Sequence, residues 1–239
     1  RVVKRALDLT YVDKIGSSGT GNDQFNYPQG ICTDGTYLYI TDTNNHRVVK
    51  RALDLTYVDK IGSSGIGNDQ FNSPQGICTD GTYLYITDTN NHRVVKRTLD
   101  LTYVDKIGSS GTGNDQFNYP RGICTDGTYL YITDTNNSRI VKRTKALVYI
   151  ATYGAFGLGV YENQWPSFPY YIPPINAVAF TDYGNNLIKI LDGSILGCVY
   201  SGPSTLTGLL TAQCTPTLVV PAAGITLQYK CGVNTGVNP

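Results

Sequence analysis

Apolar and polar residues alternate with a period of two in short runs along the first two thirds of the chain. Residues 37–40 alternate Tyr with Leu or Ile, which is typical of a half-buried β-strand. Asp34-Gly35 just before them is a strong hairpin-turn signal, and further turns follow at 43–46 and 53–56. We therefore expect four short antiparallel strands, followed by a Gly-, Ser- and Asn-rich loop at 62–74. The expected strands are residues 30–33, 36–42, 47–52 and 57–61.

This four-strand pattern is one unit of an internal repeat. Residues 1–46, 47–92 and 93–138 are near-identical copies, residues 139–200 form a diverged copy, and residues 201–239 follow as closing strands and a tail. Three correspondences link the diverged copy to the third, namely 182–189 with 134–142, Tyr153-Gly154 with Ile107-Gly108, and Pro169 with Pro120. Four strands at a period of 40–50 residues are typical of a β-propeller blade. We expect an all-β chain that forms a single propeller domain.

The repeated residues resemble a known family. Residues 71–77 read Phe-Asn-Ser-Pro-Gln-Gly-Ile, Asp80-Gly81 follows, and residues 88–94 read Asp-Thr-Asn-Asn-His-Arg-Val. This combination is similar to the NHL repeat, which implies a propeller built from four-stranded blades. The resemblance covers residues 1–143 closely and 153–200 loosely. Ser138 departs from the pattern in place of the histidine, and the diverged copy lacks the Asn-His-Arg motif.

The number of blades follows from where the repeats begin and end. The chain opens on the third strand of a unit, so residues 1–16 supply only an outer hairpin. Residues 217–220 and 225–231 could form an inner hairpin, and pairing it with residues 1–15 would close a five-bladed ring and cover two strand edges. The alternative is an open array that is completed by further repeats or by a second copy.

Residues that could carry chemistry are few. His46 and His92 occupy equivalent turns, and two histidines cannot build a three-His zinc site; we expect Asp42 or Asp88 and the following arginine to hold them. The Asp42–His46 segment offers oxygen donors in a calcium-like order but lacks the Gly and distal Glu of an EF-hand, so a turn-capping role is favoured. The Gly-rich loops lack the Lys-Ser/Thr of a phosphate loop. We predict no catalytic residue, metal or cofactor.

The cysteines form two sets. Cys32, Cys78 and Cys124 repeat at one position of successive inner strands, where pairing is geometrically awkward, and we expect them to be small buried hydrophobic residues. The other three lie outside the near-identical repeats, and two of them could form a disulfide: Cys198, Cys214 and Cys231.

The charge balance argues against a dedicated nucleic-acid partner. The chain has 19 basic and 18 acidic residues, whereas nucleic-acid binders usually have a basic excess. Lys-Arg pairs recur at 4–5, 50–51, 96–97 and 142–143, but they lie on outer strands where cross-strand pairing with Asp is the ordinary explanation. No run of 18 apolar residues indicates a membrane span.

Residues 145–239 are different in composition from the repeats. Only six charged residues lie there, beside an aromatic and proline-rich segment. A charge-poor surface of this kind is typical of a partner contact. We expect it to bind a protein partner or mediate self-assembly, through an insert that contains Tyr161, Trp165, Phe168, Tyr170 and Tyr171.

The near-identical repeats differ mainly on one face. The interblade loop and the 44–46 turn should open on the same side, and four of the five differing positions lie there or at its margin. We predict that Tyr27, Tyr119 and Arg121 contact a ligand, since Tyr and Arg are preferred anchors. The favoured function is a non-catalytic binding or assembly module that is extracellular, on a cell surface or in a virion. A propeller lyase or hydrolase and an RNA-binding propeller are the alternatives.

Overall fold

The computed structural model describes residues 1–157, 162–192 and 202–203, and these form β-strands joined by turns and short 3₁₀ helices. The N-terminal hairpin consists of β1 (Val2–Arg5) and β2 (Tyr11–Ile15). The first blade contains β5 (Pro28–Thr33), β6 (Tyr37–Asp42), β7 (Arg47–Ala52) and β8 (Tyr57–Ile61). The second blade contains β9 (Pro74–Thr79), β10 (Tyr83–Asp88), β11 (Arg93–Thr98) and β12 (Tyr103–Ile107).

The third blade contains β13 (Pro120–Thr125), β14 (Tyr129–Asp134), β15 (Arg139–Thr144) and β16 (Tyr149–Tyr153). The fourth blade contains β19 (Pro166–Ile172), β20 (Ala177–Asp182), β21 (Leu187–Asp192) and β22 (Gly202–Pro203). Two-residue strands join parallel in the interblade loops, β3 (Ser17–Ser18) with β4 (Gln24–Phe25) and β17 (Ala155–Phe156) with β18 (Glu162–Asn163). The 3₁₀ turns are η1 (Thr43–Asn45), η2 (Thr89–Asn91), η3 (Thr135–Asn137), η4 (Pro173–Ile175) and η5 (Tyr183–Asn185).

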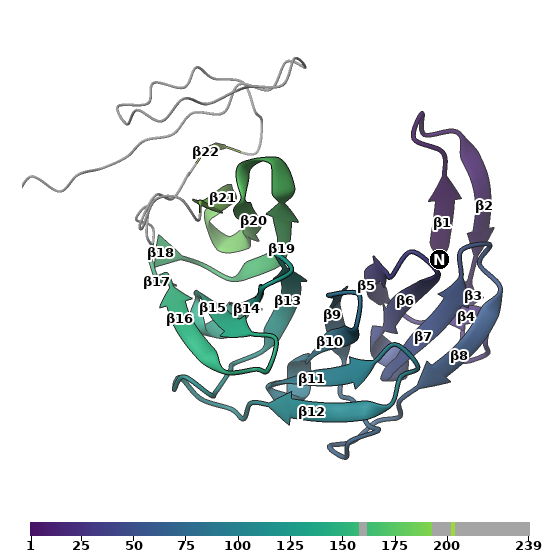
Figure 1. Ribbon diagram of the computed structural model, residues 1–239, viewed down its shortest axis with the longest axis horizontal. Helices are drawn as coiled ribbons and strands as arrows, with labels where there is room; N and C mark the ends of the chain where they lie inside the picture. The colour runs from purple at the N-terminus through teal and green to yellow at the C-terminus, as the bar shows by residue number, and fades with distance from the viewer. Residues whose placement is uncertain (158–161, 193–201, 204–239) are drawn as a thin grey trace, which may run out of the picture.

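The predicted four-stranded blade is confirmed. Each blade is an antiparallel sheet whose strands are in chain order, from the innermost to the outermost. β7 and β8 have the expected bounds, while β5 begins two residues before the expected strand. The blades follow one another around an arc, with the N-terminal hairpin at one end and the fourth blade at the other (Figure 1). The described part of the chain is therefore a β-propeller of four blades.

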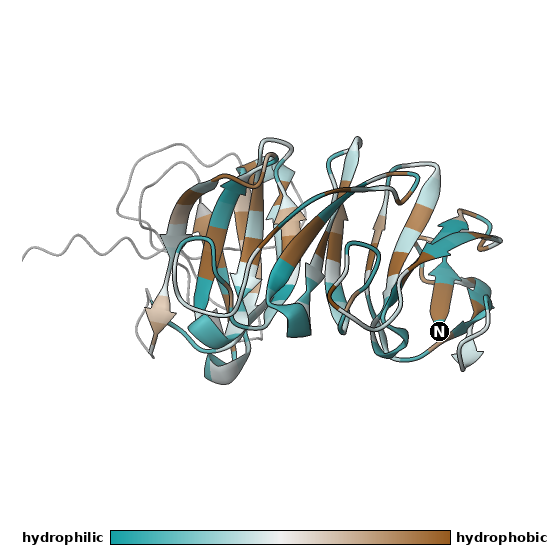
Figure 2. Ribbon diagram, turned by 90° about the horizontal axis from the view of Figure 1, so that it is seen from below, coloured by the Kyte–Doolittle hydropathy of each residue, from teal (hydrophilic) through white to brown (hydrophobic). Residues whose placement is uncertain are grey.

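The hydrophobic core lies between neighbouring blades rather than within one of them. Tyr39 and Val48 of the first blade pack with Leu84 and Val95 of the second, and similar clusters join the other neighbours. Hydrophobic positions accordingly follow the strands, and polar ones the turns at the blade ends (Figure 2). The first blade has an exposed inner strand. Ile31 is 53% exposed, whereas Ile77 at the same position of the second blade is 6% exposed.

The inner strands approach each other closely at one glycine per repeat. A Cβ added to Gly76 would lie 2.5 Å from the Arg121 carbonyl oxygen of the next blade. Gly30 and Gly122 face the following blade in the same way. Glycine is needed at this position because a neighbouring backbone occupies the space of a side chain.

The fourth blade corrects one correspondence drawn from the sequence. Pro166 pairs with Asp182 as Pro120 pairs with Asp134, so Pro166 and not Pro169 is the counterpart of Pro120. The aromatic segment after it is the inner strand β19 and is not an insertion. The added length lies in the β19–β20 turn, where η4 replaces the tight Asp-Gly hairpin. The predicted ring closure involves residues 217–231, which lie outside the described residues, as do Cys198, Cys214 and Cys231.

Two of the three repeat cysteines are buried as predicted. Cys78 and Cys124 are buried and Cys32 is half-buried, and all three are free thiols. Burial, together with the charges of Asp34 and Asp126 respectively, raises the pKa of Cys32 and Cys124 to about 12.

We expect these thiols to resist alkylation in the native protein, because the thiolate is the reactive form. Iodoacetamide at mildly alkaline pH, followed by peptide mass spectrometry, should label Cys32, Cys78 and Cys124 far more slowly than in the urea-unfolded chain. Equal labelling rates in the two states would contradict the burial of these strands.

Candidate functional site

The motif that starts at Asp42 fixes the interblade loop. Asp42 is fully buried, and its Oδ2 accepts hydrogen bonds from Arg47 Nε at 2.7 Å and Asn45 Nδ2 at 2.8 Å. The two terminal nitrogens of Arg47 donate to the carbonyl oxygens of Thr20, Gly21 and Gln24. This buried ion pair ties the 3₁₀ turn to the loop, so both open on one side of the propeller. We call this side, formed by residues 16–28 and 43–46 with their copies, the loop face.

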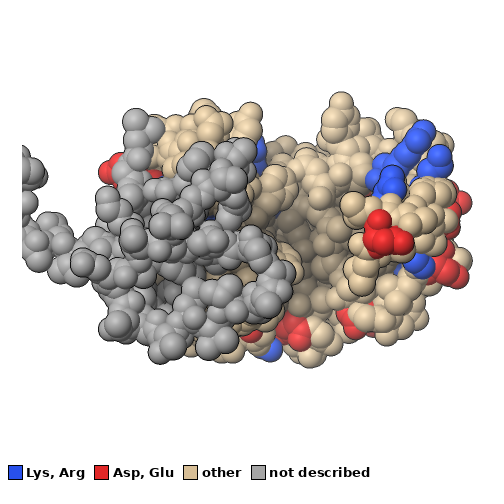
Figure 3. Space-filling view, turned by 90° about the horizontal axis from the view of Figure 1, so that it is seen from above, with Lys and Arg blue, Asp and Glu red and all other residues tan. Residues whose placement is uncertain are grey.

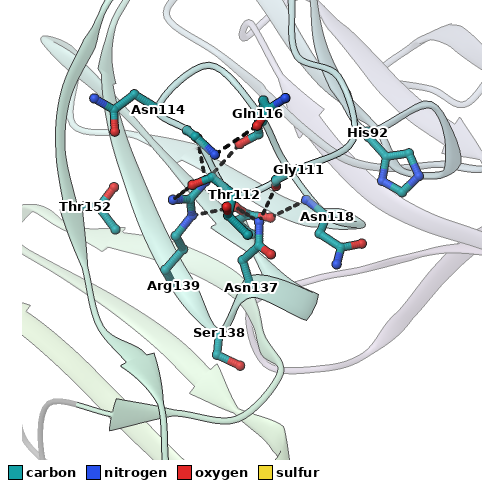
Figure 4. A network of polar contacts seen from close by, with 12 residues as sticks. His92, Gly111, Thr112, Asn114, Gln116, Asn118, Asn137, Ser138, Arg139 and Thr152 are labelled. Carbon is teal, nitrogen blue, oxygen red and sulfur yellow. Dashed lines mark hydrogen bonds and ion pairs between the residues drawn. The ribbon is translucent and has the colours of Figure 1, made fainter.

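The second and third repeats contain the same clamp. Arg93 pairs with Asp88 and Arg139 pairs with Asp134, in both cases at 2.7 Å. Figure 4 shows the Arg139 guanidinium directed at the loop, with Asn137 reaching the carbonyl oxygen of Gly111. Burial raises the pKa of Asp88 and Asp134, while hydrogen bonds from backbone amides and side chains act in the opposite direction. The motif is a structural clamp and not the predicted turn cap, because the Asp42 side chain makes no capping hydrogen bond to its own turn.

The histidines have a different role from the one expected. His46 Nδ1 accepts a hydrogen bond from the backbone N–H of Ser73 at 3.1 Å, and His92 Nδ1 accepts one from that of Tyr119 at 3.2 Å. The His92 and Tyr119 rings also meet edge to face, with centroids 4.7 Å apart. The expectation that aspartate holds them is wrong, because the carboxylates are occupied by Arg and Asn. Each histidine instead connects one blade to the next.

The Lys-Arg pairs at 50–51, 96–97 and 142–143 pack within the fold, but not through Asp on a neighbouring strand, whereas Lys4 and Arg5 are exposed. Arg51 is fully buried, contacts the ring of Phe25 and pairs with Asp23 of the interblade loop at 3.0 Å. Lys50 lies over the Tyr37 ring at 4.1 Å and donates to the Leu99 carbonyl oxygen. The copies at 96–97 and 142–143 have equivalent ring contacts. These cations are therefore committed to packing.

Figure 3 looks into the open side of the arc. In the part of the hollowed middle that is uncovered in this view, most visible residues are other than Lys, Arg, Asp and Glu, and a group of charged side chains lies over the end formed by the N-terminal hairpin. Within residues 1–157, 162–192 and 202–203, no group of three or more His, Cys, Asp or Glu side chains is placed to hold a metal ion. No helix of this same part is both long and apolar enough to cross a bilayer.

One row of equivalent residues on the loop face contains members of both predicted sites, the ligand-contacting tyrosines and the aromatic partner-contact segment. Tyr27, Ser73, Tyr119 and Trp165 each directly precede the proline that begins an inner strand, so they are equivalent positions of four successive blades. Their φ angles are 53°, 54°, 53° and 52°, a left-handed conformation that costs non-glycine residues energy. Tyr27, Tyr119 and Trp165 are 73%, 40% and 49% exposed. We call these four positions the aromatic row.

The other predicted site residues lie elsewhere. Arg121 is exposed one residue after Pro120, next to the aromatic row. Phe168 and Tyr170 are exposed on β19, at the positions of Gly122 and Cys124, which face the following blade in the repeats. Tyr171 packs against the core between the third and fourth blades. Tyr161 lies outside the described residues.

The equivalence of Trp165 with the two tyrosines was missed in the sequence, although a signal was present. Residues 163–166 read Asn-Gln-Trp-Pro and residues 117–120 read Phe-Asn-Tyr-Pro. Aligning the diverged copy on Pro166 places the aromatic residue before proline in three of the four blades. The alignment on Pro169 concealed this.

The comparison with protein families supports the repeat assignment. The model of the NHL repeat matches residues 25–50 and 71–96. These units are NHL repeats. The two matches begin at Phe25 and Phe71, shortly before the inner proline, and end within the third strand of the blade, so they include the Asp–Arg ion pair but not the loop carbonyl oxygens that the arginine binds. A comparison with curated proteins gives no match.

Solved structures of propellers are similar to this chain. A structure of streptogramin B lyase matches with a TM-score of 0.57 and 16% identity over 75% of this chain and 55% of that one. A chain of a nidogen/laminin complex matches with a TM-score of 0.62 and 21% identity over 76% and 66%. Virginiamycin B lyase from Staphylococcus aureus gives 0.53 and 20% over 74% and 55%. The chain thus spans between half and two thirds of these propellers, and the likeness establishes the fold alone.

Proposed function

We propose that this NHL-repeat chain is a non-catalytic binding module that recognises a protein or another surface ligand through the aromatic row. The observation that carries the proposal is the repetition of one left-handed position in four blades, with an exposed Tyr or Trp side chain in three of them. Strain at a non-glycine residue persists only where the surroundings enforce it, and it is concentrated at functional sites. Three of the four positions hold Tyr or Trp, which are preferred anchors of interfaces.

The rigidity of the loop face supports the same role. The αL residue Tyr119 is held by His92, and the loop before it is held by Arg139. A surface that is ordered before binding loses little conformational entropy when a partner arrives. Arg121 adds an exposed cation beside Tyr119, and we include it in the ligand contact. A setting outside the cell or on a virion is part of this proposal, and the Tyr-, Thr- and Asn-rich repeats favour it.

Serine is a suitable replacement for testing the aromatic row, because the chain already has a serine at one of the four positions. Ser73 occupies the second position with the same φ as the aromatic residues, so the triple variant Tyr27→Ser, Tyr119→Ser, Trp165→Ser should keep the backbone. We expect peptides selected from a phage-displayed random library on the wild-type chain to bind this variant at least about tenfold more weakly. Leu7→Ser with Tyr11→Ser, on the N-terminal hairpin, is the matched control and should bind normally.

Trp165 supplies a direct readout, because it is the only tryptophan in the chain. A selected peptide that occupies the row should shift or quench its emission on titration into the wild-type protein. Unchanged emission, together with equal binding to the triple-serine variant, would show that recognition occurs on another surface. Circular dichroism of the variant should match that of the wild type.

A further inference from the structure

One of the few differences between the near-identical repeats changes the 3₁₀ turn on the loop face. The turns of the first two repeats are followed by histidine, whereas Ser138 follows η3. Residues 136–138 therefore read Asn-Asn-Ser, which matches the Asn-x-Ser/Thr acceptor pattern of N-linked glycosylation. Residues 44–46 and 90–92 read Asn-Asn-His, and the pattern occurs nowhere else in the chain. The exchange of histidine for serine thus creates a single candidate acceptor, Asn136.

The fold leaves the Asn136 side chain available for modification. Asn136 is exposed, and its side-chain amide makes no hydrogen bond within the residues that the structure describes. Only its backbone N–H is used, in a hydrogen bond to the Asn118 carbonyl oxygen at 3.0 Å. A side-chain amide has two N–H donors, and Asn137 uses both, on Asp134 and on the Gly111 carbonyl oxygen, each at 2.8 Å. A glycan on Asn137 would break the clamp, whereas one on Asn136 breaks no contact.

Asn136 lies beside the aromatic row. In the second repeat, the equivalent amide of Asn90 donates a hydrogen bond to Ser73 Oγ, on the row residue of that blade, at 3.2 Å. The backbone N–H groups of Asn90 and Asn136 both donate to the residue just before the row position of their blade, at 3.0 Å. The row residue next to Asn136 is Tyr119. A glycan on Asn136 would therefore extend from the loop face directly beside the Tyr119 ring.

We propose that Asn136 is an N-glycosylation site and that its glycan covers Tyr119, so that glycosylation regulates access to the third position of the aromatic row. The glycan is bulky and well hydrated, and it excludes a ligand from the surface beside its point of attachment. The inference rests on the part of the proposed function that places the chain outside the cell, because N-linked glycans are added to secreted chains.

The modification is a group transfer from an oligosaccharide that is linked to a lipid diphosphate. The Asn136 Nδ2 atom forms a bond to C1 of the first sugar and loses one hydrogen as a proton. The bond between C1 and the diphosphate oxygen breaks, and the lipid diphosphate leaves with the electron pair. Ser138 is buried in the folded blade, so the transferase must recognise the motif before this turn folds. The folded turn then presents the modified Asn136 to solvent.

Secretion of the full chain from mammalian cells, behind an added signal peptide, tests the site by loss and by gain. The wild type should carry one glycan, and its enzymatic release by a peptide amidase should lower the mass and leave aspartate at position 136. Asn136→Gln should be secreted without a glycan. His92→Ser gives the second repeat the same Asn-Asn-Ser sequence and should carry two glycans. A wild type that is secreted without a glycan, or a glycan that remains in Asn136→Gln, would overturn the proposal.

Nitration of exposed tyrosines with tetranitromethane, followed by peptide mass spectrometry, tests whether the glycan covers Tyr119. Tyr27 is the internal control, because the turn of its blade reads Asn-Asn-His and has no acceptor. In the glycosylated wild type, Tyr119 should lose most of the reactivity that it has in Asn136→Gln from the same cells, while Tyr27 reacts equally in both. Equal reactivity of Tyr119 in the two proteins would overturn the covering of the row. Neither measurement uses a ligand, so its failure is distinct from a failure of the aromatic row to bind peptides.

Discussion

Replacing Asp88 with alanine should destabilise the protein by about 3–5 kcal/mol, because it leaves a buried cation without its partner. Asp88 is fully buried, and its two oxygens accept hydrogen bonds from Arg93, Asn91 and the Asn72 backbone. The arginine would keep its three loop carbonyl oxygens but lose the only carboxylate with which it forms an ion pair in the described structure. Thermal unfolding followed by circular dichroism should show a midpoint lower by roughly 10 °C.

Two further variants distinguish the effect of leaving Arg93 as an unpaired buried charge from the effect of removing an aspartate at any position. Asp105→Ala removes an exposed carboxylate that accepts a hydrogen bond from the backbone N–H of the adjacent Lys106. This variant should change the free energy of unfolding by no more than about 0.5 kcal/mol. Asp88→Asn keeps an acceptor of the same shape and should lie between the two. A midpoint for Asp88→Ala that equals that of Asp105→Ala would show that the clamp does not stabilise the fold.

The fourth blade keeps this ion pair by a different route, which the sequence did not reveal. The correspondence of residues 182–189 with 134–142 in the sequence places Lys189 at the position of Lys142. In the structure it pairs with Phe180 across the sheet, as Val141 pairs with Ile132. Lys189 is fully buried, and its Nζ lies 2.7 Å from Asp182 Oδ2. Leu187 occupies the arginine position, and the cation has moved two residues along the strand.

Strand geometry explains why this exchange works. Residues two apart on a strand point to the same face, so Lys189 still reaches the buried carboxylate from the neighbouring strand. Asn163 replaces the phenylalanine of the repeat, and its Oδ1 accepts a hydrogen bond from Lys189 at 3.2 Å. A comparison of sequences treats each position separately. It therefore cannot detect that the cation at 189 and the polar residue at 163 have changed together.

The blade itself could be predicted because its signals are local. Alternation in residues 37–40, the Asp34-Gly35 turn and the repeat period are properties of neighbouring residues. The contacts that were wrong or missed connect different blades. His46 binds the backbone of the following blade, and Lys50 binds the Leu99 carbonyl oxygen in the following blade. Sequence spacing does not show which face of one blade meets the next, so these roles required the structure.

Replacing Gly76 with alanine should destabilise the protein by about 2–3 kcal/mol through overpacking between two inner strands. The added Cβ would lie 2.5 Å from the Arg121 carbonyl oxygen and 2.9 Å from the Gly122 Cα, both of which belong to the backbone of the third blade. Backbone atoms cannot move aside without shifting the whole blade, which also packs against the fourth. Gly67→Ala is the matched control, since its Cβ would meet only the Gln70 side chain, with Oε1 nearest at 3.0 Å. Chemical denaturation should show a clear loss for Gly76→Ala and a small one for Gly67→Ala. Equal midpoints for the two variants would contradict the close backbone contact on which the arc of blades depends.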